Sequence, residues 1–506
     1  MIMDKQNKQI FGGTTISYVL IAINALYGLV VTPFIVSQIG DASFGVYKAI
    51  AALSSSLMII DLGLGGTVQR YIANYRARKE PHRIGNFVFM ALFEAAILSF
   101  AALVIIIGVY YNIDTIFKQG LTNEEIRLAK QLFIILGVTI ILHIFENVMN
   151  GVLTGYGCFI ISNGLRLFRV LIRFCGTFFL LFLWKSPIAL VVLDCALVLF
   201  LLLFECIYSK KSLFLKIHFS HFDKPVFKES LVYSLMMFLT AMASQMNGNL
   251  DNIVIGAFMT SKDVAVYSIS IIIFSMFQEI ACSISGLMLP KVSFLIQDGI
   301  SGAKDYMISI GRIQFILIGA VFGAFIVLGK DFIHLWMGDS YMPAYYIALI
   351  LMGPAILELC VNVCLSILRA LNKLKFKTSV TIAMMVFNAA LTIIGVKFWG
   401  YYMAAIATSM SIFLGSVLAM GLYYHKVFNF NMIKIYMSIF SRTFLCITIS
   451  SIVTFLVIFI FSDSLVRLVV GSLVFITVYL LLLYYYGLNE TEKEKVFSIK
   501  QHFCRR

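Results

Sequence analysis

Three arginines recur along one face of an apolar stretch, in the segment "RLFRVLIR". Arg166, Arg169 and Arg173 would form a stripe on a helix that rises about 10 Å at roughly 1.5 Å per residue. A guanidinium fork matches the oxygens of a phosphate. The stripe therefore predicts binding of a diphosphate headgroup that enters from the cytoplasmic side. The alternative is a set of anchors that reach the membrane surface, which explains Arg166 and Arg169 better than Arg173.

A second polar stretch reads "AMASQMNGNLDNIVIG", residues 241–256, and it also lies in apolar surroundings. At about 100° per residue its polar side chains share one arc of a helix, with Met246 and Leu250 opposite. We interpret this arc as the wall of a substrate cleft. Hydrogen bonding between helices without a ligand is the alternative. The polar residues are Ser244, Gln245, Asn247, Asn249, Asp251 and Asn252.

The segment "HIFENVMNG" places His143, Glu146, Asn147 and Asn150 on one helical face. A carboxylate beside an imidazole in a cleft of low dielectric constant can exchange a proton or hold a sodium ion. We therefore predict that Glu146 and His143 serve coupling and that Asn150 contacts substrate. A buried hydrogen-bonded pair with no further role is the alternative.

Acidic residues inside apolar segments are costly, so each requires a reason. We assign Asp61, Glu279 and Glu358 to gating or coupling; Glu358 follows Pro354 by four residues, where a kink is expected. Many such acids serve only as internal hydrogen-bond partners. Asp194, in "VVLDCALV", receives no role from the sequence.

The composition determines the class of the elements that position these side chains. Of the 506 residues, 61% are hydrophobic and 13% are charged, and the mean hydropathy is +0.95. Apolar windows of about 20 residues recur along the chain, which predicts an all-α polytopic membrane protein. We expect about fourteen transmembrane helices, over residues 13–36, 44–66, 86–111, 129–152, 168–184, 187–208, 229–257, 264–288, 307–329, 343–367, 377–398, 401–424, 437–461 and 465–487.

The distribution of Lys and Arg sets the orientation. Most of the 39 basic residues fall in the termini and the even-numbered loops, which predicts that both termini are cytoplasmic. Trp184, Trp336 and Trp399 all fall at predicted outer helix ends, in agreement. The net charge of +14 follows from this topology and from attraction to anionic lipids, without nucleic acid. The nine cysteines show neither disulfide nor zinc spacing, so no metal site is expected.

A shift of 220 residues aligns Val46 with Val266 and Tyr47 with Tyr267. This indicates two six-helix lobes that are parallel repeats around a central cleft. We expect an N-lobe over 1–210, a cytoplasmic linker over 211–228 and a C-lobe over 229–426. Helices thirteen and fourteen follow over 427–488, and a cytoplasmic tail over 489–506.

The loops are too short to hold a catalytic domain, and no nucleophile elbow, phosphate loop or HExxH motif occurs. The protein is therefore not expected to be an enzyme, and no catalytic residue is proposed.

The stretch "SQIGDASFGVYKAIAALSSSLMIIDLGLGGTVQRYIANY" resembles a family signature. It is similar to the polysaccharide-transporter (oligosaccharide flippase, Wzx-like) family of the multidrug/oligosaccharidyl-lipid/polysaccharide superfamily. The second half, "LDNIVIGAFMTSKDVAVYSIS" with "LMLPKVS", is also similar, but has Thr260 and Ala265 where the family often has Gly. The residues that carry the resemblance are Gly40, Phe44, Gly45, Tyr47, Asp61, Gly63, Arg70, Tyr71, Asp251, Gly256, Val266, Tyr267 and Pro290.

The resemblance implies a flippase in the bacterial cytoplasmic (inner) membrane. Such a protein moves undecaprenyl-diphosphate-linked oligosaccharides to the outer leaflet for O-antigen, capsule or exopolysaccharide assembly. Alternating access between two lobes, coupling to H+ or Na+ without another cofactor, and cooperation with a polysaccharide polymerase and chain-length machinery are expected. The arginine stripe suits the phosphates, and the amides of residues 245–249 suit sugar hydroxyls because amides both donate and accept.

Two other transporters remain alternatives. A multidrug exporter of the same superfamily typically has twelve helices and binds cations, which disagrees with the arginine stripe. A lipid II flippase also has fourteen helices and a cationic cleft, so it is harder to exclude. A membrane-embedded enzyme is a third class, which the lack of an extramembrane domain disfavours.

Overall fold

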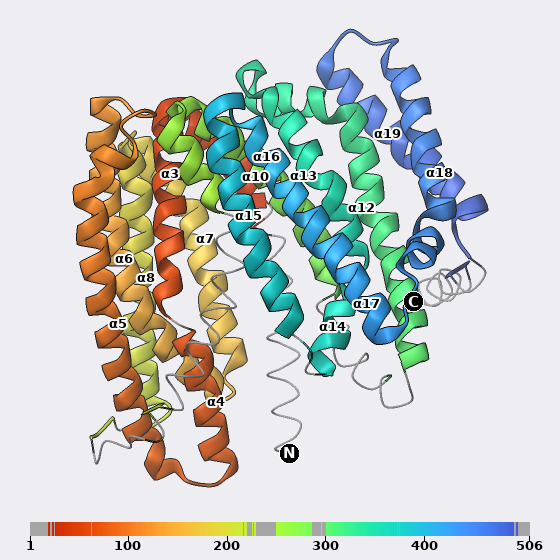
Figure 1. The fold of residues 1–506 in the computed structure, drawn as a ribbon. Helices are drawn as coiled ribbons and strands as arrows, with labels where there is room; N and C mark the ends of the chain where they lie inside the picture. Colours follow the sequence, from red (N-terminus) through yellow and green to blue (C-terminus); the bar gives the residue numbers. More distant parts are fainter. Residues whose placement is uncertain are drawn as a thin grey trace, which may run out of the picture. The chain divides into compact units, whose positions relative to one another are not determined.

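The computed structural model describes residues 27–61, 63–215, 249–285, 300–371 and 375–489, together with isolated residues between these ranges. All the regular secondary structure of these residues is helical, which confirms the predicted all-α class. The chain divides into two compact units (Figure 1). Unit 1 comprises residues 1–268 and 392–404, and unit 2 comprises residues 269–391 and 405–506.

Unit 1 contains seven α-helices and the start of an eighth, together with residues 392–404. They are α2 (Thr32–Ile39), α3 (Asp41–Leu57), α4 (Leu64–Ala77), α5 (Pro81–Ile116), α6 (Asn123–Gly155), α7 (Phe159–Leu183), α8 (Pro187–Lys211) and the start of α10 (Ser261–Ser285). The π-helical turn η1 (Tyr27–Val31) precedes α2, and the 3₁₀ turn η2 (Met58–Asp61) follows α3. Residues 249–258 are also helical.

Unit 2 contains the remainder of α10 and the later helices. These are α12 (Ile300–Met337), α13 (Pro343–Cys360), α14 (Val363–Ala370), α15 (Lys375–Trp399), α16 (Tyr402–Ser411), α17 (Met420–Phe428), α18 (Met432–Ile458) and α19 (Ser464–Leu482). Three short elements complete it: η4 (Asp339–Tyr341), η5 (Ile412–Ala419) and η6 (Leu483–Gly487). The division between the units falls within α10, within α15 and near the start of α16.

Among the described residues, ten helices are long and apolar enough to cross a membrane. The pair Tyr27–Ile39 and Asp41–Leu57, bent by 120°, would add one more if it forms a single span. Helix α7 is not among the ten, because Arg166, Arg169 and Arg173 fall together in every 18-residue window of its 25 residues. These findings confirm a polytopic membrane protein. The count of fourteen helices and the cytoplasmic termini stay predictions.

Several helices extend beyond the boundaries predicted from hydropathy. Helix α6 begins at Asn123 rather than at 129 because a capping box precedes it: the Thr122 side chain accepts from the backbone of Glu125, and the Glu125 carboxylate accepts from the backbone of Thr122 at 2.8 Å. Helix α7 begins at Phe159 rather than at 168. Arg166 therefore lies two turns inside the helix, rather than at its opening as the sequence predicts.

Two predicted continuous helices are broken in the structure. The segment 44–66 divides into α3, η2 and α4, and Gly63 adopts a left-handed conformation (φ 67°) at the N-cap of α4. The segment 343–367 divides after Cys360, one and a half turns beyond Pro354, and continues as α14. Apolar composition does not predict such breaks, because the residues on both sides of each break are predominantly apolar.

Helix α6 is the centre of unit 1 and packs against α3, α4, α5, α7 and α8 (Figure 1). Glycines set its approach to α4: a Cβ on Gly151 would lie 2.5 Å from the carbonyl oxygen of Gly65, and one on Gly155 would lie 2.8 Å from Cβ of Ile72. Side chains at these positions would force the helices apart. The contact holds the η2 turn beside the polar face of α6, which positions the site.

Candidate functional site

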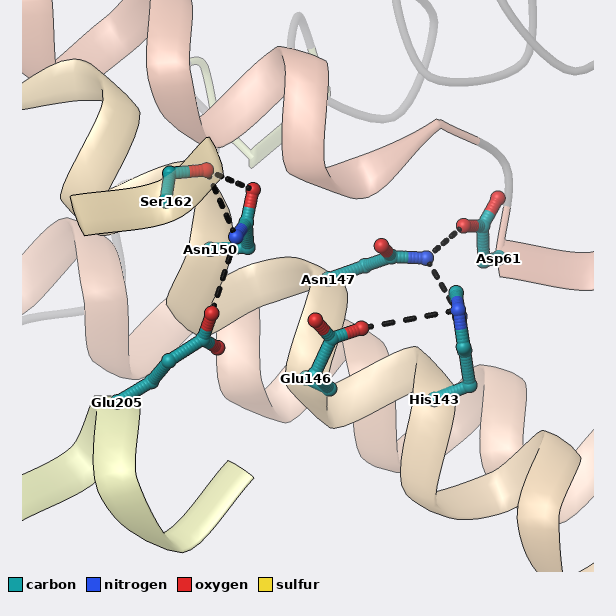
Figure 2. Close-up of polar contacts among 7 residues, drawn as sticks. All are labelled: Asp61, His143, Glu146, Asn147, Asn150, Ser162 and Glu205. Atoms are coloured by element: carbon teal, nitrogen blue, oxygen red, sulfur yellow. Dashed lines mark hydrogen bonds and ion pairs between the residues drawn. The ribbon is translucent and has the colours of Figure 1, made fainter. Parts of the chain in front are cut away.

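The polar face of α6 meets the η2 turn through Asn147 (Figure 2). Its side-chain amide donates to Asp61 Oδ2 at 2.5 Å and to His143 Nδ1 at 3.0 Å. The other oxygen of Asp61 accepts from the backbone N–H of Gly63 at 2.9 Å. The structure thus brings together two predicted coupling residues, Asp61 and His143, which are 82 positions apart in the sequence.

The third predicted coupling residue, Glu146, completes this group. Because Nδ1 of His143 accepts from Asn147, the ring proton is on Nε2, which faces Glu146 Oε2 at 3.7 Å. The side chains of His143 and Glu146 are 23% and 10% exposed. We call Asp61, His143, Glu146 and Asn147 the acidic cluster. It contains two carboxylates and an imidazole, and the contact between the imidazole and Glu146 is longer than a hydrogen bond.

Two residues of the arginine stripe, Arg166 and Arg169, lie near the acidic cluster. Arg166 and Arg169 lie within electrostatic range of both Glu146 and His143. Arg169 is partly buried and Arg166 is exposed. The stripe therefore presents cations opposite acids of α6, and only Arg166 has the solvent contact expected of a surface anchor.

Asn150 belongs to a second group of polar side chains from three helices (Figure 2). Its amide nitrogen donates to Glu205 Oε1 of α8 at 2.9 Å and to Ser162 Oγ of α7 at 3.1 Å. Glu205 is fully buried, and its Oε2 has no hydrogen-bond partner among the described residues. The sequence reasoning missed Glu205 and Ser162, although a glutamate within the apolar run "LLLFECIY" was a usable signal.

Arg173, the highest residue of the stripe, pairs with an acid of the next helix. Its Nη2 lies 2.9 Å from Asp194 Oδ2 and 3.5 Å from the hydroxyl oxygen of Tyr47. The guanidinium carbon lies 5.3 Å from the ring centre of Tyr27, in a cation–π arrangement. Lys48 is in electrostatic range of Arg173. The acid that received no role from the sequence is therefore the counter-ion of the uppermost arginine.

The described part of the amide-rich stretch begins at Asn249, which is partly exposed. Asp251 is 1% exposed and accepts hydrogen bonds from Tyr267 at 2.5 Å and Thr392 at 3.3 Å. Asn252 accepts from Ser268 at 3.1 Å. These contacts join residues 249–258 to α10 and α15. The other residues predicted to bind substrate in this stretch, Gln245 and Asn247, lie outside the described residues, as does Ser244.

Two predicted gating acids belong to unit 2. Glu358, near the end of α13, lies 3.9 Å from Lys377 Nζ, which also donates to Ser416 at 3.2 Å. Glu279 is partly exposed on α10, and Glu279 and Glu358 both lie within electrostatic range of Cys282. The described residues include no group of three or more His, Cys, Asp or Glu arranged to hold a metal ion.

Membrane-length helices and charged side chains within them define a multi-pass membrane protein. The profile of a family described as "Polysaccharide biosynthesis protein" matches residues 10–294, more than half of the sequence. The chain belongs to this family, which confirms the family resemblance stated from the sequence. A search of curated proteins finds no significant match.

Solved structures show the same fold. The lipid II flippase MurJ, in an inward closed conformation, aligns with a TM-score of 0.73 at 16% identity, over 93% of this chain and 97% of MurJ. An inward-facing multidrug resistance MATE transporter of the MOP superfamily aligns with a TM-score of 0.60 at 15% identity, over 83% and 94%. A MOP-superfamily transporter from Pyrococcus furiosus aligns with a TM-score of 0.54 at 15% identity, over 83% and 97%. At these identities the likeness concerns the fold.

Proposed function

We propose that this protein is a flippase that moves lipid-linked oligosaccharides across the bacterial cytoplasmic membrane by alternating access. The lipid carries a diphosphate, which in the undecaprenyl form would serve O-antigen, capsule or exopolysaccharide assembly. The observation that carries the proposal is the arginine stripe of α7, three cations within one membrane-length helix of a polysaccharide-biosynthesis family member.

The stripe supports an anionic substrate for an energetic reason. A cation inside the membrane region costs roughly 2.5–3.5 kcal/mol on the insertion scale, so three on one helix require compensation. All three arginines have acids nearby, and Arg166 alone is exposed. A diphosphate that binds first at Arg166 would then meet Arg169 and Arg173 in order along the helix.

The proposal is tested by surface polysaccharide in the native host. We expect Arg173→Ala to abolish the polymer while the protein remains inserted and abundant. Arg127→Ala, an exposed arginine on α6, is the matched control and should leave the polymer unchanged. Normal polymer in the Arg173 variant would refute the assignment.

The acidic cluster supports coupling to H+ or Na+, and we propose that Glu146 carries this role with His143 and Asp61. Glu146→Gln keeps the size of the side chain and one acceptor oxygen, replaces the other oxygen by an NH2 donor, and removes the titration. Transport by this variant should lose part of its pH dependence between pH 5 and 8 in proteoliposomes. Glu124→Gln, exposed in the first turn of α6, is the control. An unaltered pH profile for Glu146→Gln would reduce this acid to a structural role.

A lipid II flippase is the second candidate, because MurJ shares the fold over nearly its whole length. Lipid II also carries a diphosphate on a polyprenyl chain, so the arginine stripe suits both substrates. Complementation distinguishes them. Growth of cells depleted of their lipid II flippase would favour this candidate, and rescue of polymer export alone would favour the repeat-unit flippase.

A further inference from the structure

We propose that Asp194 is an internal competitor of the substrate phosphate at Arg173, an anion that holds Nη2 of the guanidinium until the diphosphate replaces it. This inference rests on the proposed function and adds a residue that positions the uppermost cation.

Arg173 is paired but not saturated. Its Nη2 donates to Asp194 Oδ2 at 2.9 Å and to the hydroxyl of Tyr47 at 3.5 Å. Its Nε and Nη1 have no hydrogen-bond acceptor among the described residues, and its side chain is 35% exposed. The ring of Tyr27 lies against the guanidinium at 5.3 Å and fixes its plane. Nε and Nη1 are therefore open to an anion, whereas Nη2, which belongs to both two-nitrogen edges of the guanidinium, is held by Asp194 and Tyr47.

Asp194 binds Nη2 weakly for a largely buried carboxylate. It binds through one oxygen, whereas an arginine–carboxylate pair reaches its full strength with two parallel hydrogen bonds. Its second oxygen, Oδ1, is buried and has no hydrogen-bond partner in the described part of the chain. A buried acceptor without a partner costs stability. A phosphate, with more oxygens and more charge, can take Nη2 from Asp194 and bind it together with Nε or Nη1.

The charges around Asp194 allow the diphosphate to replace it at Arg173. Arg169 lies within electrostatic range of Asp194 on one side and Glu146 on the other. Asp194 can therefore compensate Arg169 when Arg173 turns to the diphosphate. Each arginine keeps an anion near it at every stage, so no cation is left uncompensated in a medium of low dielectric constant. After the diphosphate leaves, Asp194 returns to Arg173 and opposes rebinding.

The experiment measures binding of inorganic pyrophosphate to the full chain in lipid nanodiscs at fixed ionic strength. Asp194→Asn should bind pyrophosphate about tenfold more tightly than the unmodified protein, the effect of one charge-assisted hydrogen bond on an equilibrium constant. Polymer export should nevertheless fall, because release becomes slow. The control is Asp331→Asn, which removes a carboxylate 3.6 Å from Arg467 in unit 2 and should leave both readouts unchanged.

A second variant keeps the inference testable if Asp194→Asn does not fold. Arg173→Lys retains the charge beside Asp194 but lacks the free Nε and Nη1 donors of the guanidinium. Pyrophosphate binding should therefore weaken about tenfold. Unchanged binding by this variant, or equal or weaker binding by folded Asp194→Asn, would overturn the role of Asp194 and leave the flippase proposal standing. If Arg169→Gln and Arg173→Gln both bind pyrophosphate normally, the stripe is not a phosphate site and both proposals fall.

Discussion

Arg173 in unit 1 and Arg312 in unit 2 both pair with an acid at close range, but they use their remaining donors differently. Arg312 on α12 binds Glu492 through Nε at 2.8 Å and through Nη2 at 3.1 Å. Its other donors reach the carbonyl oxygens of Ser438 and Gly487, both at 3.0 Å. Its side chain is 6% exposed, against 35% for Arg173.

This difference separates two roles for an intramembrane arginine. All three nitrogens of Arg312 donate to groups of α18, the end of η6 and the segment after it, so this arginine fastens α18 and α19 to α12. Arg173 has two nitrogens without an acceptor among the described residues, and about a third of its side chain is exposed, so it can bind a further anion. A guanidinium whose three nitrogens all donate hydrogen bonds is structural. One that has free donors and a single bond to its acid can bind an anion. Distance to the acid alone does not distinguish the two.

The largest effect on stability is expected at Arg312. Arg312→Leu removes the guanidinium from both oxygens of Glu492, whose Oε2 still accepts from the backbone N–H of Asn489, and from two carbonyl groups. The free energy of unfolding should therefore fall by about 3–5 kcal/mol. Denaturation in mixed detergent micelles, followed by circular dichroism, measures this change. A loss below about 1 kcal/mol would show that water replaces the guanidinium and that Arg312 does not fasten the helices.

A smaller effect on stability is expected at Arg173. Arg173→Lys keeps a cation beside Asp194, and the side chain is about a third exposed, so the free energy of unfolding should change by no more than about 1 kcal/mol. The same denaturation experiment measures it. A loss as large as that of Arg312→Leu would mean that both arginines are structural and that the free Nε and Nη1 of Arg173 have no separate role.

The smallest effect is expected at an exposed ion pair of short distance. Lys130 and Asp114 lie 2.5 Å apart, with side chains 28% and 55% exposed. Solvent screens such a pair, so Asp114→Asn should change the free energy of unfolding by less than about 0.5 kcal/mol. A larger loss would indicate that the distance between the charged atoms, rather than their burial and the number of donors used, determines how much an ion pair stabilises the fold.

Local periodicity predicted the faces of the helices but not their partners. Asn147 and Asn150 were placed on one face of a helix, and both lie on the polar side of α6. Packing then sends Asn147 to Asp61 in the η2 turn and Asn150 to Glu205 on α8. The helical periodicity of 3.6 residues reports direction around an axis. It contains no information about which neighbouring helix lies in that direction.

The break between α3 and α4 shows the same limit. Asp61 was predicted within one continuous helix, and the structure places it in a 3₁₀ turn before Gly63. The close approach of Gly65 and Gly151 then brings this turn to α6. The sequence contains these glycines, but their pairing across 86 residues depends on how two helices cross.

The sequence by itself determined the properties that depend on composition and on neighbouring residues: an all-helical membrane protein, its family, and a stripe of three arginines on one helix. These follow because hydropathy and helical periodicity act locally along the chain. Only the tertiary structure decided that Asp194 pairs with Arg173, that Glu146 lies within electrostatic range of Arg169, and that Glu492 is bound by Arg312. Those pairs arise from packing between helices distant in sequence, where a shift of one residue would turn each side chain toward a different neighbour.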